Sequence, residues 1–286
     1  MATLLDGKET ARAVRAELRE AVAAFTAESG CVPGLAVVLV GDDPASQVYV
    51  RNKHRACEEV GIRSDVYTLP ADTSNAELLS LIEKLNADKT VSGILVQLPL
   101  PKQLDEEKVL LAIDPEKDVD AFHPVNVGKI MIGNFTLAPC TPAGVMELLR
   151  HYGISVCGKH CVIIGRSNIV GKPQAMLMLK ENATVTVCHS RTVGLADIAR
   201  TADILVAAVG RPRFVTADMV KDGAVVVDVG INRMADGKLC GDVDFDAVCE
   251  KASFITPVPG GVGPMTITML LKNTLAAAKE QLEKTK

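Results

Sequence analysis

A lysine on the apolar side of a predicted helix is the first residue that could do chemistry. The segment from Asp43 to Gly61 is expected to form one helix, which Asp43 caps and Gly61 ends. At roughly 100° per residue, Lys53 lies one turn after Tyr49 in an apolar arc formed by Ala45, Val48, Tyr49, Val50, Ala56, Cys57 and Val60. A lysine among apolar groups loses hydration of its charged form, so its pKa falls and it can exchange protons near neutral pH. A lysine that extends along the helix to reach water is the alternative.

Polar side chains that could act with Lys53 follow the strands of the same half of the chain. Gln97 lies in the strand segment “GILVQLPLP”, and the loop “PEKDVDAFHP” carries Asp118 and Asp120. Because ligands bind beyond the carboxyl ends of strands in open α/β sheets, we expect Tyr49, Lys53, Gln97 and an aspartate to form one site. Gln97 would orient the lysine amine through its amide. Core packing for Tyr49 and a loop or capping role for Asp120 are the alternatives.

The segment “GRSNIVGKP”, from Gly165 to Pro173, could hold a phosphate. It joins a buried strand to a helix, where backbone N–H groups and the helix dipole favour an anion. Gly165, Arg166 and Ser167 are the residues of this turn that are expected to contact a cofactor. The pattern G-x-S-x-x-x-G-x-P departs from the usual dinucleotide fingerprint, so an ordinary strand-to-helix turn is the alternative.

The next strand favours NADP over NAD as the cofactor. In NAD-selective folds this strand usually ends in an acid that binds the ribose hydroxyls, whereas here it ends in His189, Ser190 and Arg191. Ser190 and Arg191 could bind the 2′-phosphate that an acid would repel, with Arg166 nearby. A solvated arginine is the alternative for Arg191. Two later strands run into “AAVGRP” and “DVGIN”, where Ile231 could pack on the cofactor or belong to the core.

The elements that must position these residues alternate between strands and helices, which predicts α/β architecture with parallel sheets. The first half is expected to form a βαβαβ unit after a long helix at about 8–28, with strands near 35–41, 65–69 and 93–101. The second half has the rhythm of a doubly wound nucleotide-binding fold. Its strands are expected near 160–165, 184–190, 203–210, 224–231 and 254–260, with a short hairpin around 235–238.

The predicted fold class is therefore α/β with two domains, an N-terminal α/β substrate domain and a C-terminal Rossmann-like doubly wound dinucleotide-binding domain. The expected boundaries are 1–122 for the first domain and 139–265 for the second. A helix capped by Thr141 follows the connecting loop, and a helix is expected near 216–223. The final helix, at about 266–286, is expected to pack back on the first domain.

Composition argues against several other classes of protein. With 48% hydrophobic residues, a net charge of −4 and no run of Lys or Arg, the chain is expected to act on small molecules rather than nucleic acid. No apolar run reaches the roughly 18 residues of a membrane span, and the first residues lack the layout of a signal peptide. We therefore expect no membrane association and a cytoplasmic protein. The eight cysteines lack the paired spacings of a zinc site, so we expect them to be reduced, with no bound metal.

Seven motifs together resemble a known enzyme family. They are “YVRNK”, “VQLPLP”, “PEKDVDAFHP”, “PCTPAG”, “GRSNIVGKP”, “CHSRT” and “PVPGGVGPMT”. In this order and spacing, over nearly the whole chain, the sequence is similar to the bifunctional methylenetetrahydrofolate dehydrogenase/methenyltetrahydrofolate cyclohydrolase family.

The resemblance implies an enzyme that oxidises 5,10-methylenetetrahydrofolate with NADP⁺ to the methenyl cation. The same enzyme would then hydrolyse the cation to 10-formyltetrahydrofolate. The family pattern implies that Tyr49 stacks on the aminobenzoyl ring of the substrate and that Asp120 binds the pterin. Lys53 would transfer protons, assisted by Gln97.

Two further features are implied by the resemblance alone. Pro259, Gly260 and Gly261 would line the folate site in a rigid loop, which would suit a cis-proline. Members of the family are typically homodimers through their nucleotide-binding domains.

The chain departs from the family at Ala121, where the family usually has glycine after the pterin-binding aspartate. If that backbone needs a positive φ, alanine costs about 1 kcal/mol and could shift Asp120. A dehydrogenase with weak or no cyclohydrolase activity is one alternative function, and a catalytically silent nucleotide-binding module is another. The presence of Lys53, Gln97 and Asp120 argues against the silent module, which needs no proton-transfer residue.

Overall fold

The computed structural model describes residues 1–285, which form two compact units. Unit 1 contains Met1–Arg12 and Thr141–Thr266, and unit 2 contains Ala13–Cys140 and the described chain from Ile267 onward. Two long helices, α1 (Gly7–Ser29) and α10 (Val262–Thr285), each begin in unit 1 and continue in unit 2. Both units are therefore built from segments that lie far apart in the sequence.

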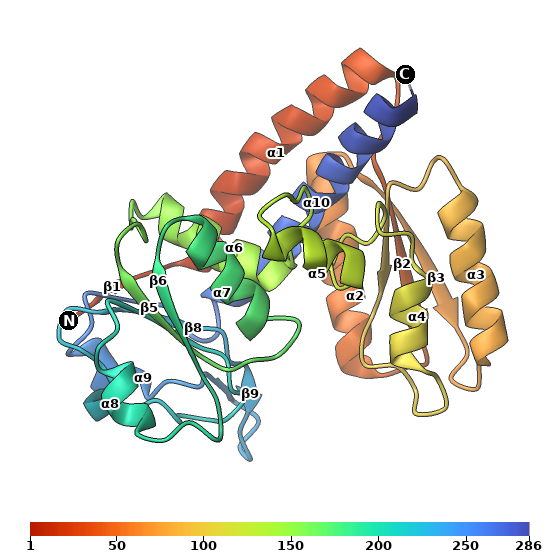
Figure 1. Ribbon diagram of the computed structural model, residues 1–286. Helices are drawn as coiled ribbons and strands as arrows, with labels where there is room; N and C mark the ends of the chain where they lie inside the picture. Colours follow the sequence, from red (N-terminus) through yellow and green to blue (C-terminus); the bar gives the residue numbers. More distant parts are fainter. Residues whose placement is uncertain (286) are drawn as a thin grey trace. The chain divides into compact units, whose positions relative to one another are not determined.

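Unit 2 is built on a parallel three-stranded sheet with the order β3-β2-β4. Its strands are β2 (Gly34–Val40), β3 (Arg63–Leu69) and β4 (Gly93–Val96), and its shorter helices are α2 (Pro44–Val60), α3 (Asn75–Ala87), α4 (Glu106–Ala112) and α5 (Pro124–Met131). Strand β2 is buried along its length because it lies between the other two. On one face, Ala36 and Val38 pack with Leu78 and Ile82 of α3 and with Val109 of α4. Helices α3 and α4 thus cover that face (Figure 1).

The ends of the unit 2 helices follow from their capping residues. Asp43 Oδ2 accepts a hydrogen bond from Ser46 N at 2.8 Å, and Gly61 ends α2 with a φ of 82°. Ser74 and Glu77 form a capping box at the start of α3. The predicted limits of α2 are confirmed, so the register that places Lys53 on this helix is fixed at both ends.

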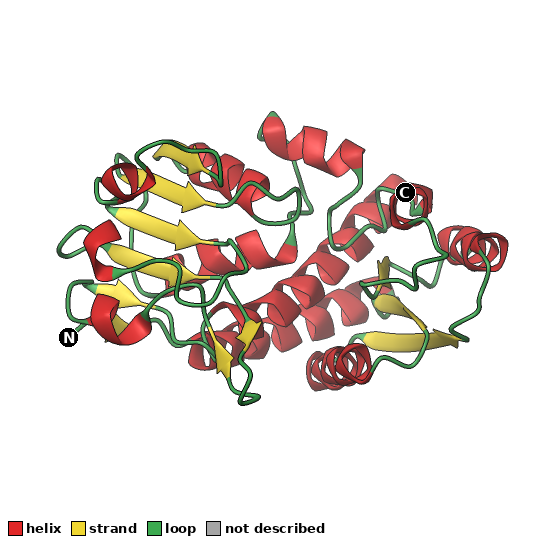
Figure 2. Cartoon of the chain, turned by 90° about the horizontal axis from the view of Figure 1, so that it is seen from below, coloured by secondary structure: helices red, strands yellow, loops and turns green. Residues whose placement is uncertain are grey.

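Unit 1 contains a doubly wound parallel sheet of six strands with the order β1-β11-β8-β7-β5-β6. The strands of a parallel sheet are drawn as yellow arrows in Figure 2. The strands are β1 (Thr3–Leu4), β5 (His160–Ile164), β6 (Thr184–Cys188), β7 (Ile204–Ala207), β8 (Val225–Asp228) and β11 (Phe254–Ile255). The helices are α6 (Cys140–His151), α7 (Gly171–Lys180), α8 (Leu195–Ala199) and α9 (Phe245–Cys249), and the predicted hairpin is the antiparallel pair β9 (Asn232–Arg233) and β10 (Leu239–Cys240).

Helices cover both faces of this sheet. Ile163 packs in a core with Met178 of α7, whereas its neighbour Val162 packs with Ala199 of α8 and Val248 of α9. Strand β5 lies between β6 and β7, so the direction of winding reverses there, and ligands bind at the carboxyl ends of strands next to such a point. The predicted fold class is confirmed.

The first residues belong to a different unit from the one expected. The sequence prediction placed 1–122 together, but β1 pairs with β11 in the register Thr3↔Phe254, which puts Met1–Arg12 in unit 1. A two-residue strand has no periodicity that reveals a partner so far along the chain.

Three local predictions were wrong. The segment of α5 was expected to be loop, but Pro124 occupies its first turn and His123 Nδ1 accepts from Val125 N as a cap. The helix expected near 216–223 is only a 3₁₀ turn, η1 (Ala217–Met219), because the chain is already extended at Val220. Helix α6 begins at Cys140, so Thr141 lies inside it rather than capping it.

Candidate active site

Lys53 lies in the middle of the buried strip of α2. The buried residues Ser46, Val50, Cys57 and Val60, together with half-buried Lys53, follow the 4-3-4-3 spacing of one helix face. The lysine amine donates a hydrogen bond to Gln97 Oε1 at 2.9 Å. The charged end of Lys53 is therefore held by a partner within unit 2 instead of extending into water.

The predicted apolar arc of α2 needs correction. Ala45, Val48 and Tyr49 are exposed, and Tyr49 keeps 48% of its surface accessible. The reason is that only one face of α2 packs inside unit 2, and the side of the helix that carries Val48 and Tyr49 lies beside that face. An exposed phenol ring one turn before a half-buried amine can contact a ligand that the amine also reaches.

Gln97 is oriented by its own backbone neighbour. It follows the last residue of β4, and its Nε2 donates to Leu98 O at 2.7 Å. The amide oxygen is thereby left to face Lys53. The peptide bond between Leu98 and Pro99 is cis.

Burial and charge act in opposite directions on Lys53. Burial lowers the pKa of the Lys53 amine below that of an ordinary lysine, and the Asp120 carboxylate partly offsets this effect. Burial likewise raises the pKa of Asp120, against the attraction of Lys53. A lysine whose charged form is destabilised in this way can act as a proton acceptor closer to neutral pH.

The two predicted aspartates have different surroundings. Asp118 is buried, and its Oδ2 accepts from His123 N at 2.8 Å and from Asn126 Nδ2 at 3.0 Å. Burial raises the pKa of Asp118 to about 6. Because its carboxylate is used by neighbouring backbone and amide groups, Asp118 organises the loop, while Asp120 is the aspartate that acts on Lys53.

The loop that carries both aspartates is anchored to β4 and α3. Ile94 N donates to Lys117 O at 2.7 Å, and Ile94 of β4 forms an isolated parallel bridge with Asp118. The buried Lys117 amine donates to the carbonyl oxygens of Leu85, Asn86 and Asp88, at 3.0, 2.7 and 2.7 Å. These carbonyls lie at the end of α3, where helical partners are absent.

Two residues that the sequence prediction did not assign to the site also hold this loop. Cys140 Sγ donates to Val119 O at 3.4 Å and lies 3.5 Å from Asp120 Oδ1. Asn273 of α10 donates through Nδ2 to Val119 O and to Ala138 O, both at 2.8 Å. Asn273 stands between Lys272 and Thr274 in the sequence, so no local pattern marked it as a site residue.

The backbone at Ala121 has the positive φ that is costly for a residue other than glycine. Its φ is 57°, and the side chain is fully buried. Ala121 N nevertheless donates to Asp118 O at 3.0 Å, so the turn closes with alanine in place.

The turn after β5 in unit 1 fits a pyrophosphate. Gly165 has a φ of 130°, and a Cβ there would collide with Ala208 O. A Cβ on Gly171 would collide with the Gly165 carbonyl, so both positions need glycine. Helix α7 begins at Gly171, where Gly171 N donates to Ser167 Oγ at 3.4 Å and Lys172 N donates to Ser167 O at 3.1 Å. The positive end of the α7 dipole lies at this turn and favours an anion. Ser167 Oγ accepts from Val170 N at 3.1 Å, so its own hydrogen can be donated to a ligand.

The turn after β6 presents cationic and hydroxyl groups instead of an acid. Arg191 N donates to His189 Nδ1 at 3.1 Å, and His189 N donates to Thr192 Oγ1 at 2.9 Å. The side chains of Ser190 and Arg191 are exposed, as is that of Arg166 on the preceding turn. This arrangement suits a phosphate on the adenosine ribose.

Other predicted contact residues lie on loops of unit 1. Ile231 follows β8 and is 49% exposed, so it is not a core residue. The peptide bond between Val258 and Pro259 is cis, as expected for this loop, and Gly260 has a φ of 110°. Gly261 N donates to Pro257 O at 2.8 Å.

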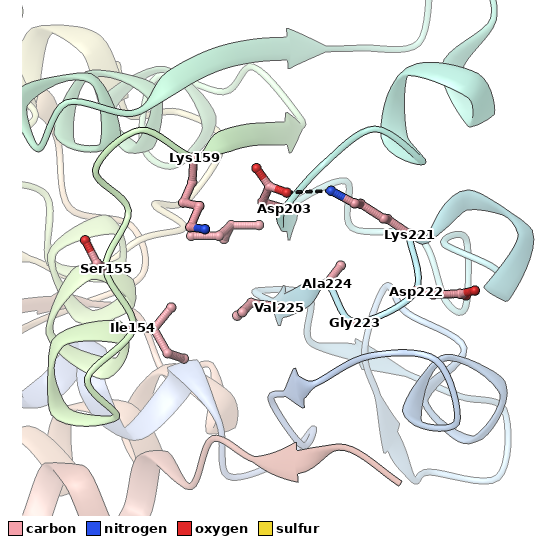
Figure 3. A pocket seen from close by; sticks show the side chains of 10 residues that line it. Ile154, Ser155, Lys159, Asp203, Lys221, Asp222, Gly223, Ala224 and Val225 are labelled. Carbon is pink, nitrogen blue, oxygen red and sulfur yellow. Dashed lines mark hydrogen bonds and ion pairs between the residues drawn. The ribbon is translucent and has the colours of Figure 1, made fainter.

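A cavity of about 240 Å³ in unit 1 lies at the opposite end of its sheet (Figure 3). Its lining includes Lys159, Asp203 and Lys221, and the Lys221 amine pairs with Asp203 Oδ1 at 2.6 Å. The cavity adjoins the amino ends of β7 and β8, whereas cofactors bind at carboxyl ends, so it is not the cofactor site.

Other kinds of site are not found among residues 1–285. No group of three or more His, Cys, Asp or Glu side chains in this range could hold a metal ion. The helices of the same range include none that combines the length and apolar character needed to cross a membrane.

Comparison with known proteins identifies the family. Residues 5–120 match the family model described as tetrahydrofolate dehydrogenase/cyclohydrolase, catalytic domain, and residues 139–282 match its NAD(P)-binding domain. The chain belongs to the tetrahydrofolate dehydrogenase/cyclohydrolase family. The bifunctional protein FolD of Moorella thermoacetica is 63% identical over 97% of this chain and 99% of that protein.

Solved structures of family members agree. The bifunctional FolD enzyme of Campylobacter jejuni is 52% identical, with a TM-score of 0.95 over 98% of this chain and 99% of that one. The Trypanosoma brucei enzyme, solved with NADP cofactor and an inhibitor, is 44% identical, with a TM-score of 0.92 over 98% of each chain. The predicted family, bifunctional dehydrogenase/cyclohydrolase function and NADP cofactor are confirmed.

Proposed function

We propose that one bound folate undergoes two reactions and that Lys53 is the proton-transfer residue of the second. The first reaction oxidises 5,10-methylenetetrahydrofolate to the methenyl cation, and the second hydrolyses the cation to 10-formyltetrahydrofolate. The observation that carries this assignment is the half-buried Lys53 amine, 2.9 Å from Gln97 Oε1, with a pKa lowered by burial and influenced by Asp120.

Lys53 acts on the water that opens the methenyl ring. A nicotinamide cofactor held by the residues of unit 1 would accept the hydride in the first reaction. The positive charge of the methenyl product further disfavours a neighbouring ammonium, so the Lys53 amine is neutral when water must be activated. The amine takes one proton as the water oxygen bonds to the methenyl carbon. When the bond to N5 breaks and the formyl oxygen forms, N5 gains one proton, and one proton is released in total.

The remaining residues of the α2 site bind and orient the folate. Asp120 can accept two parallel hydrogen bonds from the 2-amino group and N3–H of the pterin. Tyr49 offers an exposed ring for stacking on the aminobenzoyl group. Gln97 holds the Lys53 amine through an amide that is itself fixed by Leu98 O. The family resemblance alone supports folate contacts from Pro259, Gly260 and Gly261.

The cofactor groups of unit 1 account for a preference for NADP over NAD. Gly165, Arg166 and Ser167 would hold the pyrophosphate, Ser190 and Arg191 the 2′-phosphate, and Ile231 the ring at the other end. Arg191→Ala is expected to weaken NADP⁺ binding by about tenfold, the scale of one charge-assisted hydrogen bond. Titration of the wild type and the variant with NADP⁺ and NAD⁺ tests this, and equal wild-type affinity for the two cofactors would contradict it.

One assay tests the proposed chemistry. Methylenetetrahydrofolate and NADP⁺ are supplied, and the methenyl absorbance is followed in the wild type and in Lys53→Ala. We expect the variant to bind NADP⁺ normally but to lose enzymatic decay of the methenyl absorbance. Arg51→Ala, at an exposed position of the same helix, is the matched control and should behave as wild type. Decay at the wild-type rate in Lys53→Ala would refute the role of Lys53.

The assembly and location of the protein are further parts of the proposal. Tyr49, Lys53, Gln97 and Asp120 belong to unit 2, and the proposed cofactor residues belong to unit 1. Homodimer formation through the nucleotide-binding domain is supported by the family resemblance and by β6, an edge strand with Val187 39% exposed. Sedimentation analysis tests it. A cytoplasmic location without nucleic-acid partners is supported by free cysteines and by a net charge of −4.

A further inference from the structure

Two buried aspartates lie beside the loops that follow β7 and β8. Asp228 ends β8 and is 3% exposed, and Asp242 follows β10 and is fully buried. The proposed function uses neither side chain. A buried carboxylate is costly unless its oxygens accept several hydrogen bonds, so the donors that surround these two show what they hold in place.

Asp242 binds two separate loops with one carboxylate. Its Oδ2 accepts from Val209 N at 2.6 Å and from Gly210 N at 2.9 Å. Its Oδ1 accepts from Arg211 N and from Asn232 Nδ2, both at 2.9 Å. Three successive backbone N–H groups after β7 and one side chain after β8 therefore depend on the same two oxygen atoms.

Asp228 holds the segment that carries Asp242. Its Oδ1 accepts from Asp242 N and Gly230 N at 2.9 Å, and its Oδ2 accepts from Val243 N at 2.9 Å. The two carboxylates lie so close to the backbone at positions 230 and 241 that only glycine fits there. A Cβ on Gly230 would collide with Asp242 Oδ1, and a Cβ on Gly241 would collide with Asp228 Oδ2.

The topology indicates which part of a cofactor these loops face. The winding of the sheet reverses between β5 and β7, and the turn after β6 with Arg191 lies on one side of that point. The loops after β7 and β8 lie on the other side, so they face the mononucleotide half that is remote from the 2′-phosphate. Ile231 lies between Gly230, which Asp228 binds, and Asn232, which Asp242 binds.

We propose that Asp242 is a positioning residue for the nicotinamide half of the cofactor. It acts through the backbone of 209–211 and through Asn232, and it fixes the two loops against which the nicotinamide ring is placed. This inference rests on the proposed cofactor function and adds to it a residue that does not itself contact the cofactor.

Asp242→Asn tests the proposal, because the amide that replaces one carboxylate oxygen cannot accept from the N–H groups that face it. The Kd values of NADP⁺ and of adenosine 2′,5′-bisphosphate are measured by calorimetry. The bisphosphate carries only the half of the cofactor that the turn after β6 binds. We expect the Kd of NADP⁺ to rise at least about tenfold, the effect of one lost hydrogen bond to a charged group. The Kd of the bisphosphate should change less than about twofold.

Cyclohydrolase activity gives an internal control, since hydrolysis of the methenyl folate consumes no cofactor. Its kcat should stay within about twofold of wild type in Asp242→Asn. Asp244→Asn is the matched control, because it makes the same change two residues away at a position without a side-chain cap bond. Asn232→Ala removes one of the four hydrogen-bond donors to Asp242. It should raise the Kd of NADP⁺ less than Asp242→Asn does, and it should again leave the Kd of the bisphosphate nearly unchanged.

Three results would overturn the inference. Unchanged NADP⁺ binding in Asp242→Asn would show that the loops are fixed by other contacts. Equal weakening of NADP⁺ and the bisphosphate would show a general loss of unit 1 structure instead of positioning. If Asp242→Asn does not fold, Asn232→Ala decides the matter, and an unchanged Kd of NADP⁺ there refutes the role. A wild type that does not bind NADP⁺ would refute the proposed cofactor function itself.

Discussion

The charge state of Lys53 depends on a carboxylate that can be removed. Burial lowers the pKa of Lys53, and Asp120 partly restores it. Asp120→Asn removes the negative charge, so the pKa of Lys53 should fall further and the neutral amine should persist to lower pH. We therefore expect the acidic limb of the kcat profile for methenyl hydrolysis to move to lower pH in this variant. The profile is measured at saturating substrate after the uncatalysed rate is subtracted, and a limb that moves to higher pH would contradict the expectation.

Ala121 combines a strained backbone with a buried methyl group. Its φ of 57° costs about 1–2 kcal/mol for a residue other than glycine. Ala121→Gly relieves that strain but loses about 0.8 kcal/mol of methyl burial and adds about 0.4–1 kcal/mol of chain entropy to the unfolded state. We expect the free energy of unfolding to change by less than about 1 kcal/mol.

The folate KM of Ala121→Gly should also stay within about twofold of wild type. The reason is that the turn is closed by two bonds to Asp118, from Ala121 N and from His123 N. Urea denaturation and steady-state kinetics check both expectations. A KM that falls well beyond twofold would show that alanine displaces Asp120 from its best position.

The loop between α4 and α5 depends on a lysine that acts as a helix cap. Lys117 is 7% exposed, and its amine donates to three carbonyl oxygens at the end of α3. Lys117→Met keeps the aliphatic stem but removes the lysine donor from all three carbonyls, of which Asp88 O keeps its bond from Val91 N. We therefore expect the free energy of unfolding to fall by about 2–4 kcal/mol. Urea denaturation measures the change. Lys89→Met, at an exposed position just beyond α3, should change it by less than about 0.5 kcal/mol, and an equal effect of the two substitutions would contradict the capping role.

The elements that could be predicted from sequence were those whose signals are local. Helix α2 was predictable because Asp43 and Gly61 mark its ends, and the order of strands and helices followed from hydrophobic pattern and turn residues. The residues of α2 that are buried could not be predicted, because an amphipathic pattern does not show which helical turns pack against the rest of unit 2. Val48 and Tyr49 belong to the apolar pattern but are exposed in the structure.

The residues that could not be predicted from the sequence make contacts with segments far away along the chain. The proximity of Lys53 and Gln97 could be predicted, because ligand-binding residues gather at the carboxyl ends of strands in open α/β sheets. Asp120 was suggested by the family motif. Asn273 lies 154 residues from Val119 along the chain, and no local pattern connects the two. The bonds of Asp242 to residues about 30 positions earlier were missed for the same reason.

Each unit of the molecule contains its own buried polar group that fixes a ligand loop. In unit 2, Asn273 donates to Val119 O beside Asp120 and to Ala138 O. In unit 1, Asp242 accepts from the loops after β7 and β8. The hydrogen bonds described for these two residues have no partner in common. Affinity for folate and affinity for cofactor should therefore respond to separate substitutions.

A double-mutant cycle tests this separation in the whole protein. Asn273→Ala removes the amide donor from Ala138 O and from Val119 O, which keeps the weaker Cys140 thiol donor. The substitution should therefore raise the folate KM by about tenfold and leave the NADP⁺ KM within about twofold. Asp242→Asn should do the reverse. Because residues without shared partners act additively, each KM of the double variant should lie within about twofold of the product of the single effects. Steady-state kinetics with each substrate varied at saturation of the other measures all four values. A cofactor KM that rises in Asn273→Ala, or a double variant far from the product, would show that the two loops are coupled across the units.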